Sequence, residues 1–146
     1  MTVASRATIR TALASLITAY VTSAQIVYDH EPGDLGSDSP IIVLASQGSD
    51  RPPLTFQGNQ SAFSFTVDIY TLAAESASGA YSYSASATVV DSCEAQFAAL
   101  IAASQENGFW SQIRYAGPSQ IDFGIFGADA IPRFRERIPL RITLFS

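Results

Sequence analysis

Residues 61–71, "SAFSFTVDIYT", decide the fold, because large apolar side chains alternate there with small or polar ones. The apolar members occupy odd positions: Phe63, Phe65, Val67 and Ile69. In an extended strand, side chains two residues apart lie on one face, so this segment predicts a strand with one buried and one open face. Other elements of the chain must cover the apolar face.

Two segments have the helical periodicity to provide that cover. The first spans residues 4–20, with Ser5 as its N-cap and an apolar stripe of Ile9, Leu13, Leu16, Ile17 and Tyr20. The second begins at a capping pair, Thr88 with Asp91, and ends at Asn107-Gly108. Its buried stripe is predicted to contain Val90, Cys93, Phe97, Leu100, Ile101 and Ser104.

The first of these segments also imitates a short secretory signal, because Arg6 and Arg10 precede an apolar run with a small-residue end. Thr11, Ser15 and Thr18 interrupt that run, however, and the helical stripe continues across them. We therefore expect a structural helix.

The remaining segments predict five further strands, at residues 25–29, 40–46, 110–116, 119–127 and 133–145. Turns are expected at residues 47–53 and at Gly117-Pro118. The Ala/Ser-rich segment 73–87 lacks the bulk to build a core, so we expect an exposed connection, with a strand extension carrying Tyr81 and Tyr83 as one form of it. The order α-β-β-β-α-β-β-β predicts a single α+β domain over residues 1–146, with a mainly antiparallel sheet covered on one face by two helices.

Composition excludes several classes of function. The net charge is -5 and all eight basic residues are arginine, so the electrostatic footprint of a nucleic-acid binder is missing. A single cysteine permits neither an intrachain disulfide nor a cysteine-based zinc site. No segment approaches the roughly 18 to 20 apolar residues of a membrane span. Because 47% of residues are hydrophobic and only 14% are charged, we expect another chain to cover part of the surface.

The segment 28–40, "YDHEPGDLGSDSP", gathers the residues that could perform chemistry. Its carboxylates and its histidine could hold a divalent cation, but their spacing does not match a calcium loop, which favours a solvated loop. His30 is the only available base for a catalytic triad, and no nucleophile elbow surrounds any serine. Phosphate-binding glycine patterns are absent, and Cys93 falls on an apolar helix face. We expect no enzymatic activity, no metal and no cofactor.

The last strand carries half of the positive charge of the chain. Its arginines all occupy odd positions, so alternation places them on one face: Arg133, Arg135, Arg137 and Arg141. Two interpretations stay open. The arginines line a solvated outer face whose edge is marked by Pro139, or they bind carboxylates of an adjacent chain. For the second interpretation, the candidate contact residues outside this strand are Asp29, Glu31, Asp34, Asp38, Asp50 and Arg51.

The order of these segments resembles a known family. A helix, a strand ending in "VYDHEP" (27–32), the continuation "DLGSDSPIIVL" (34–44), a turn "SQGSDR" (46–51), the aromatic strand and a second helix are similar to the tail terminator, or tail completion, proteins of long-tailed bacteriophages. The Ala/Ser-rich segment 73–87 departs from this pattern, which leaves the exact position in the neck open.

The resemblance implies a non-enzymatic virion subunit of the tail neck, assembled in the host cytoplasm. Subunits of this family form a ring, usually of six copies, that ends growth of the tail tube and offers a surface for joining the head. The implied partners are other copies of the chain, the tail tube protein, and the head-tail connector or head-completion protein; DNA can pass through the channel without specific binding, and no membrane is involved. The acidic segment 29–40 would then be an interaction loop.

Three alternatives remain. The first is another neck or tail tube component of a phage. The second is a small periplasmic ligand-binding module, which predicts cleavage near Ala24 and a monomer. The third is a hydrolase that uses His30 with a nearby serine or carboxylate.

Overall fold

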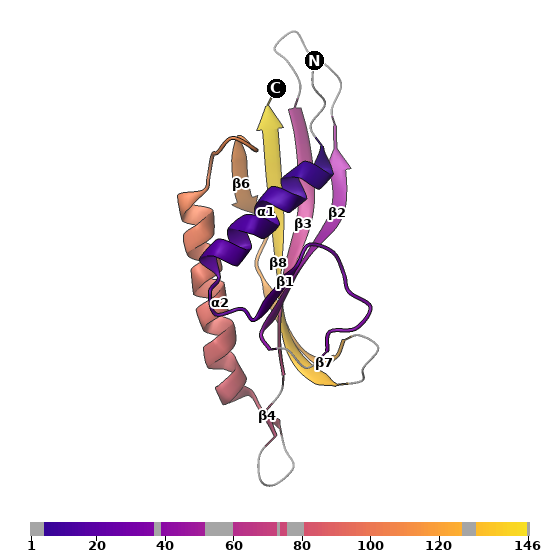
Figure 1. Ribbon diagram of the computed structural model, residues 1–146, viewed down its shortest axis with the longest axis vertical. Helices are drawn as coiled ribbons and strands as arrows, with labels where there is room; N and C mark the ends of the chain where they lie inside the picture. Colours follow the sequence, from indigo (N-terminus) through magenta and orange to yellow (C-terminus); the bar gives the residue numbers. More distant parts are fainter. Residues whose placement is uncertain are drawn as a thin grey trace.

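The computed structural model describes residues 5–36, 39–51, 60–72, 74–75, 81–126 and 131–145. It confirms the predicted α+β class: two helices lie on one face of a six-stranded, mostly antiparallel sheet (Figure 1). The helices are α1 (Arg6–Tyr20) and α2 (Tyr83–Ala103). The strand order in the sheet is β1 (Ile26–Tyr28), β2 (Ile41–Asp50), β3 (Gln60–Leu72), β8 (Pro132–Phe145) and β6 (Gln112–Tyr115), with β7 (Gln120–Ile125) also paired to β8. Two short strands, β4 (Ala74–Glu75) and β5 (Tyr81–Ser82), pair separately.

The central pair of the sheet is β3 with β8, and its register confirms the alternation predicted for residues 61–71. Phe65 lies opposite Leu140 and Val67 opposite Ile138, so both strands turn their apolar side chains toward the helices. These side chains are almost fully buried. At roughly 25 cal/mol per Å² of apolar surface removed from water, this layer is the main source of stability.

The first helix has its predicted cap, and both helices pack through their predicted stripes. The Ser5 side chain accepts a hydrogen bond from the Thr8 amide, which confirms the predicted N-cap of α1. The buried residues of α1 are Ile9, Leu13 and Ile17, while Tyr20 at its end is partly exposed. Every member of the predicted stripe of the second helix is buried. Figure 1 shows α1 running obliquely across the sheet and α2 running along the β6 side.

The second helix starts earlier than predicted. It begins at Tyr83 rather than at Thr88, and it ends at Ala103, before Asn107. Thr88 therefore lies inside the helix, where its carbonyl accepts a hydrogen bond from the Ser92 hydroxyl, and the predicted cap is wrong. After Tyr83, residues 84–87 are serine and alanine, which carry no apolar stripe, so the periodicity did not indicate a helix there although alanine favours one.

The strand pairing differs from the prediction in two places. Strand β2 continues through residues 47–50, which were expected to turn, with a register shift between Ser46 and Gly48. Strands β6 and β7 flank Gly117-Pro118 but form no hairpin; each pairs with a different part of the long strand β8. Strand β8 is therefore an interior strand, and Pro139 does not mark an edge. Its missing N–H costs little because Pro139 lies level with the break between β6 and β7.

The acidic segment folds back on the face of the sheet that the helices leave open. Leu35 is buried there in a second apolar cluster with Ile41, Val43 and Tyr70. Gly36 has a positive φ of 69°, a conformation that glycine adopts without strain, and its amide donates to an Asp34 carboxylate oxygen at 3.0 Å. The loop is thus attached to its own chain by packing, and not only by its ends.

Candidate functional site: a charged sheet face and an apolar sheet edge

The four arginines of β8 lie on the face of the sheet opposite the helices. Strand register places Arg137 opposite Asp68, Arg135 opposite Tyr70, and Arg141 opposite Ser64. The shared face predicted from alternation is confirmed by this register. The structure also shows ion pairs that the sequence did not indicate: three of the arginines have carboxylate partners within the same chain.

The strongest of these pairs joins Arg137 to Asp68. Two nitrogens of the guanidinium, Nε and Nη2, donate to the two carboxylate oxygens at 2.9 and 3.0 Å. The Asp68 carboxylate is buried, and the Tyr70 hydroxyl donates a third, longer bond to it at 3.4 Å. The hydrogen bonds to Asp68 raise the pKa of Arg137 further above its ordinary value.

The neighbouring pairs are progressively more exposed. Arg135 donates to Asp122 of β7 at 2.9 Å, and its guanidinium lies 4.2 Å from the centre of the Phe126 ring. Arg141 approaches Asp50 at 3.6 Å, and the Asp50 side chain is 69% exposed. A pair of this last kind contributes at most about 1 kcal/mol to stability.

Arg133 is fully buried and contacts backbone carbonyl groups. Its guanidinium donates to the carbonyl oxygens of Gly36, Phe126 and Ile131. The bond to Gly36 joins the acidic loop to β8 through a backbone carbonyl. The role of the four arginines at a contact between chains stays a prediction.

The acidic residues of segment 29–38 differ in their surroundings. Asp29 accepts a hydrogen bond from His30 at 2.8 Å, and that bond lowers the pKa of Asp29. Glu31 and Asp34 are exposed, and Asp38 lies outside the described residues. In the described part of the chain, no three histidine, cysteine or acidic side chains gather as metal ligands would.

The predicted contact residue Arg51 and the cysteine Cys93 both interact with their own chain. Arg51 donates to the Ser61 hydroxyl at 3.3 Å and lies 5.2 Å from the centre of the Phe63 ring. Cys93 is fully buried among core residues, and burial raises the pKa of its thiol to about 11, which disfavours the nucleophilic thiolate. Neither described helix is long and apolar enough to cross a membrane.

Strand β7 is an exposed apolar edge that the sequence pattern alone did not indicate. Three large apolar side chains of this strand are about half exposed to solvent: Ile121 49%, Phe123 51% and Ile125 61%. Strand β8 is its neighbour on one side, and no described strand lies on the other. The alternation is visible in "QIDFGI", but only the structure shows that these side chains stay exposed although they lie on the same side of the sheet as the helices.

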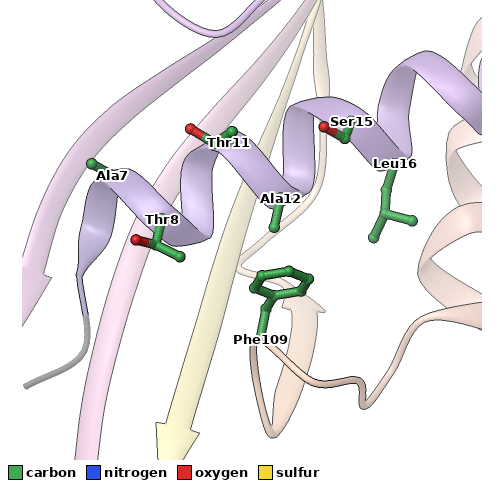
Figure 2. A pocket seen from close by; sticks show the side chains of 7 residues that line it. All are labelled: Ala7, Thr8, Thr11, Ala12, Ser15, Leu16 and Phe109. Carbon is green, nitrogen blue, oxygen red and sulfur yellow. The ribbon is translucent and has the colours of Figure 1, made fainter. Parts of the chain in front are cut away.

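A second exposed apolar feature is a groove between α1 and the loop that precedes β6. It has a volume of about 520 Å³ and is lined by Ala7, Thr8, Thr11, Ala12, Ser15, Leu16 and Phe109. Figure 2 shows the Phe109 ring below Ala12, with the Leu16 side chain beside it. Because its lining contains no ionisable side chain, this groove can form apolar contacts but offers no acid or base.

Acidic groups gather where β8 approaches α2. Glu136 of β8 is paired in register with Ile121 and is buried. Burial raises the pKa of Glu136, a hydrogen bond with Ser119 opposes this, and the nearby carboxylates of Glu94 and Asp91 raise it further. A negative charge at Glu136 is therefore unfavourable in the folded chain.

This arrangement predicts a pH-dependent effect of Glu136→Gln. A carboxyl whose folded pKa lies above its unfolded value contributes stability that is present below the unfolded pKa and lost as pH rises through the folded pKa. The glutamine variant should therefore melt at a higher temperature than the wild type at pH 7, and the gain should shrink toward pH 4. Thermal melts at both pH values measure this; a gain of equal size at both would show that ionisation is not its cause.

Comparisons with known proteins give a distant structural similarity. No family model matches the chain, and no curated protein sequence matches it. Among solved structures, a chain in the virion of a native gene transfer agent (GTA) particle is similar, with 14% sequence identity and a TM-score of 0.44. The similarity covers 95% of this chain and 91% of that chain.

Proposed function

We propose that this protein is a structural virion subunit that forms a ring at the head-proximal end of a phage tail tube, ends tube growth and provides the surface for joining the head. The specific role comes from the sequence resemblance to tail terminator proteins. The observation that carries the proposal is the apolar edge strand β7, whose large side chains would be exposed to water in an isolated chain.

The distribution of charge supports a role in contact rather than in catalysis. The strongest ion pair, between Arg137 and Asp68, lies within the sheet and holds its strands in register. The thiol of Cys93 is buried, and His30 is exposed beside Asp29. The proposed role requires no acid, base or nucleophile, and we propose no reaction for this chain.

The role is tested by assembling phage particles without the protein. We expect tail tubes of irregular, excessive length that fail to join heads, and we expect the purified protein to stop tube growth when it is added back. Electron microscopy measures the tube lengths and the fraction of joined particles. Tails of normal length that join heads in the absence of the protein would contradict the proposal.

A further inference from the structure

We propose that the β7 edge of one copy of this chain docks against the β1 edge of the next copy, so that the sheet continues from subunit to subunit around the ring. The inference rests on the proposed ring and assigns its contact surfaces. A head-to-tail contact of this kind joins two different surfaces of identical chains and closes into a ring when the rotation permits.

The two edges lie at opposite ends of the sheet and at the same level along the strands. Strand register links Ile121 of β7 to Glu136, Ile69, Ile42 and finally Val27 of β1, in one row across the sheet. Rotation about an axis along the strands keeps this level, so it brings Ile121 of one copy beside Val27 of the next. Strand β7 would then run antiparallel to β1, as neighbouring strands do through most of the sheet.

The β1 edge has a recess whose lining is partly apolar and partly polar. A hollow of about 270 Å³ lies between α1 and β1, and it is lined by Thr11, Ala14, Ser15, Thr18, Val27, Tyr28, Asp29 and His30. Val27 lies on the helix-covered side of the sheet, as Ile121 does, because their rows coincide. The side chain of Ile121 can therefore enter this hollow and leave water, while the same register places Ile125 opposite Ser23, just before β1. The pairing of the two strand edges would satisfy their backbone groups.

The charges of the two helices are complementary across this contact. The charged residues of α1 are Arg6 and Arg10, whereas those of α2 are Asp91 and Glu94. Arg10 donates to Ser46 at 3.2 Å on the β2 side of the sheet.

Burial raises the pKa of Tyr115, on the β6 side, and the nearby Glu94 carboxylate raises it further. Ser46 and Tyr115 belong to the same row, through Phe65 and Leu140. The basic edge of one copy thus faces the acidic edge of the next at the same level. Opposite charges at this position favour the heterologous contact and oppose the pairing of two identical edges.

The apolar part of the contact is tested by Ile121→Asp combined with Ile125→Asp. Both side chains are exposed, so the variant should fold, as circular dichroism can check. We expect its self-association, measured by light scattering, to weaken at least tenfold. The matched control is Phe145→Asp, since Phe145 is 58% exposed at the end of β8, away from both edges, and this variant should associate as the wild type does.

The charged part is tested by reversal. Glu94→Arg alone and Arg10→Glu alone should each weaken association, and the double variant should recover it, because the swapped pair restores attraction. A disulfide test locates the edges directly: in the variant Val27→Cys with Ile121→Cys, oxidation should link different copies into a covalent ladder, whereas each single variant should not form the ladder.

The outcomes separate this contact from the proposed function. If the wild type associates and the Ile121 and Ile125 variant associates equally well, the contact is wrong and the ring can still stand. A second outcome is a wild type that stays monomeric at high concentration, with Ile121 and Ile125 controlling its binding to tube ends. In that case the β7 edge binds the tube protein, and the proposed contact between copies is overturned. If association requires β7 but tails lacking the protein have normal length, the contact stands and the proposed function fails.

Discussion

Replacing Arg137 with methionine should lower the free energy of unfolding by about 3 kcal/mol, because it leaves the buried carboxylate of Asp68 without its charged partner. Both oxygens of that carboxylate accept from Arg137, and the Tyr70 hydroxyl alone cannot replace two charge-assisted bonds. Urea denaturation followed by circular dichroism measures the loss.

The matched control is Arg141→Met, in the same strand and on the same face of the sheet. Its partner Asp50 is exposed and lies at 3.6 Å, so we expect a loss below about 1 kcal/mol. The double variant Asp68→Asn with Arg137→Met should recover part of the loss, since no buried charge remains. Equal losses at Arg137 and Arg141 would mean that burial of Asp68 does not govern the energy of the pair.

Replacing Arg133 with methionine should release the acidic loop from the sheet. The guanidinium of Arg133 is buried and joins three backbone carbonyls, including that of Gly36, so its removal leaves buried acceptors unsatisfied at a cost of about 2 kcal/mol. Hydrogen exchange at the Gly36 amide, which donates to Asp34 in the closed loop, should increase more than exchange in β3.

The control for this experiment is Arg114→Met, because Arg114 is exposed on β6. This variant should change stability by less than about 0.5 kcal/mol and leave exchange at Gly36 unaltered. If Arg133→Met destabilised the whole chain without faster exchange at Gly36, the loop would be held by the packing of Leu35 alone.

Local sequence patterns predicted those elements whose structure depends on local geometry. The stripe of α1 and the alternation of β3 were both recognisable, because each follows the period of its own backbone. The start of α2 at Tyr83 was not predicted, because the serines and alanines that follow it show no apolar periodicity. The later residues of the helix hold it in place. The arrangement of β6 and β7 was not predicted, because it depends on the length of β8. Strand β8 is long enough for both short strands to pair along the same side of it, one after the other.

The candidate contact residues illustrate the same limit. Four arginines at odd positions had to share a face, but their partners could not be assigned by sequence. Asp68 lies 69 positions from Arg137, and in its own strand it is one polar residue among several. The acidic segment 29–38 is the conspicuous cluster of carboxylates in the sequence, which makes it the candidate partner. In the structure, Arg133 contacts that loop through the Gly36 carbonyl.

By itself, the sequence determined the α+β class, the apolar face of the sheet and the common face of the arginines, since these follow from periods of about two and 3.6 residues along the chain. Only the tertiary structure decided which charges are paired within the chain and which edge of the sheet is left apolar and exposed. Ion pairing and edge exposure depend on strand order and register, which bring together residues that no local period relates.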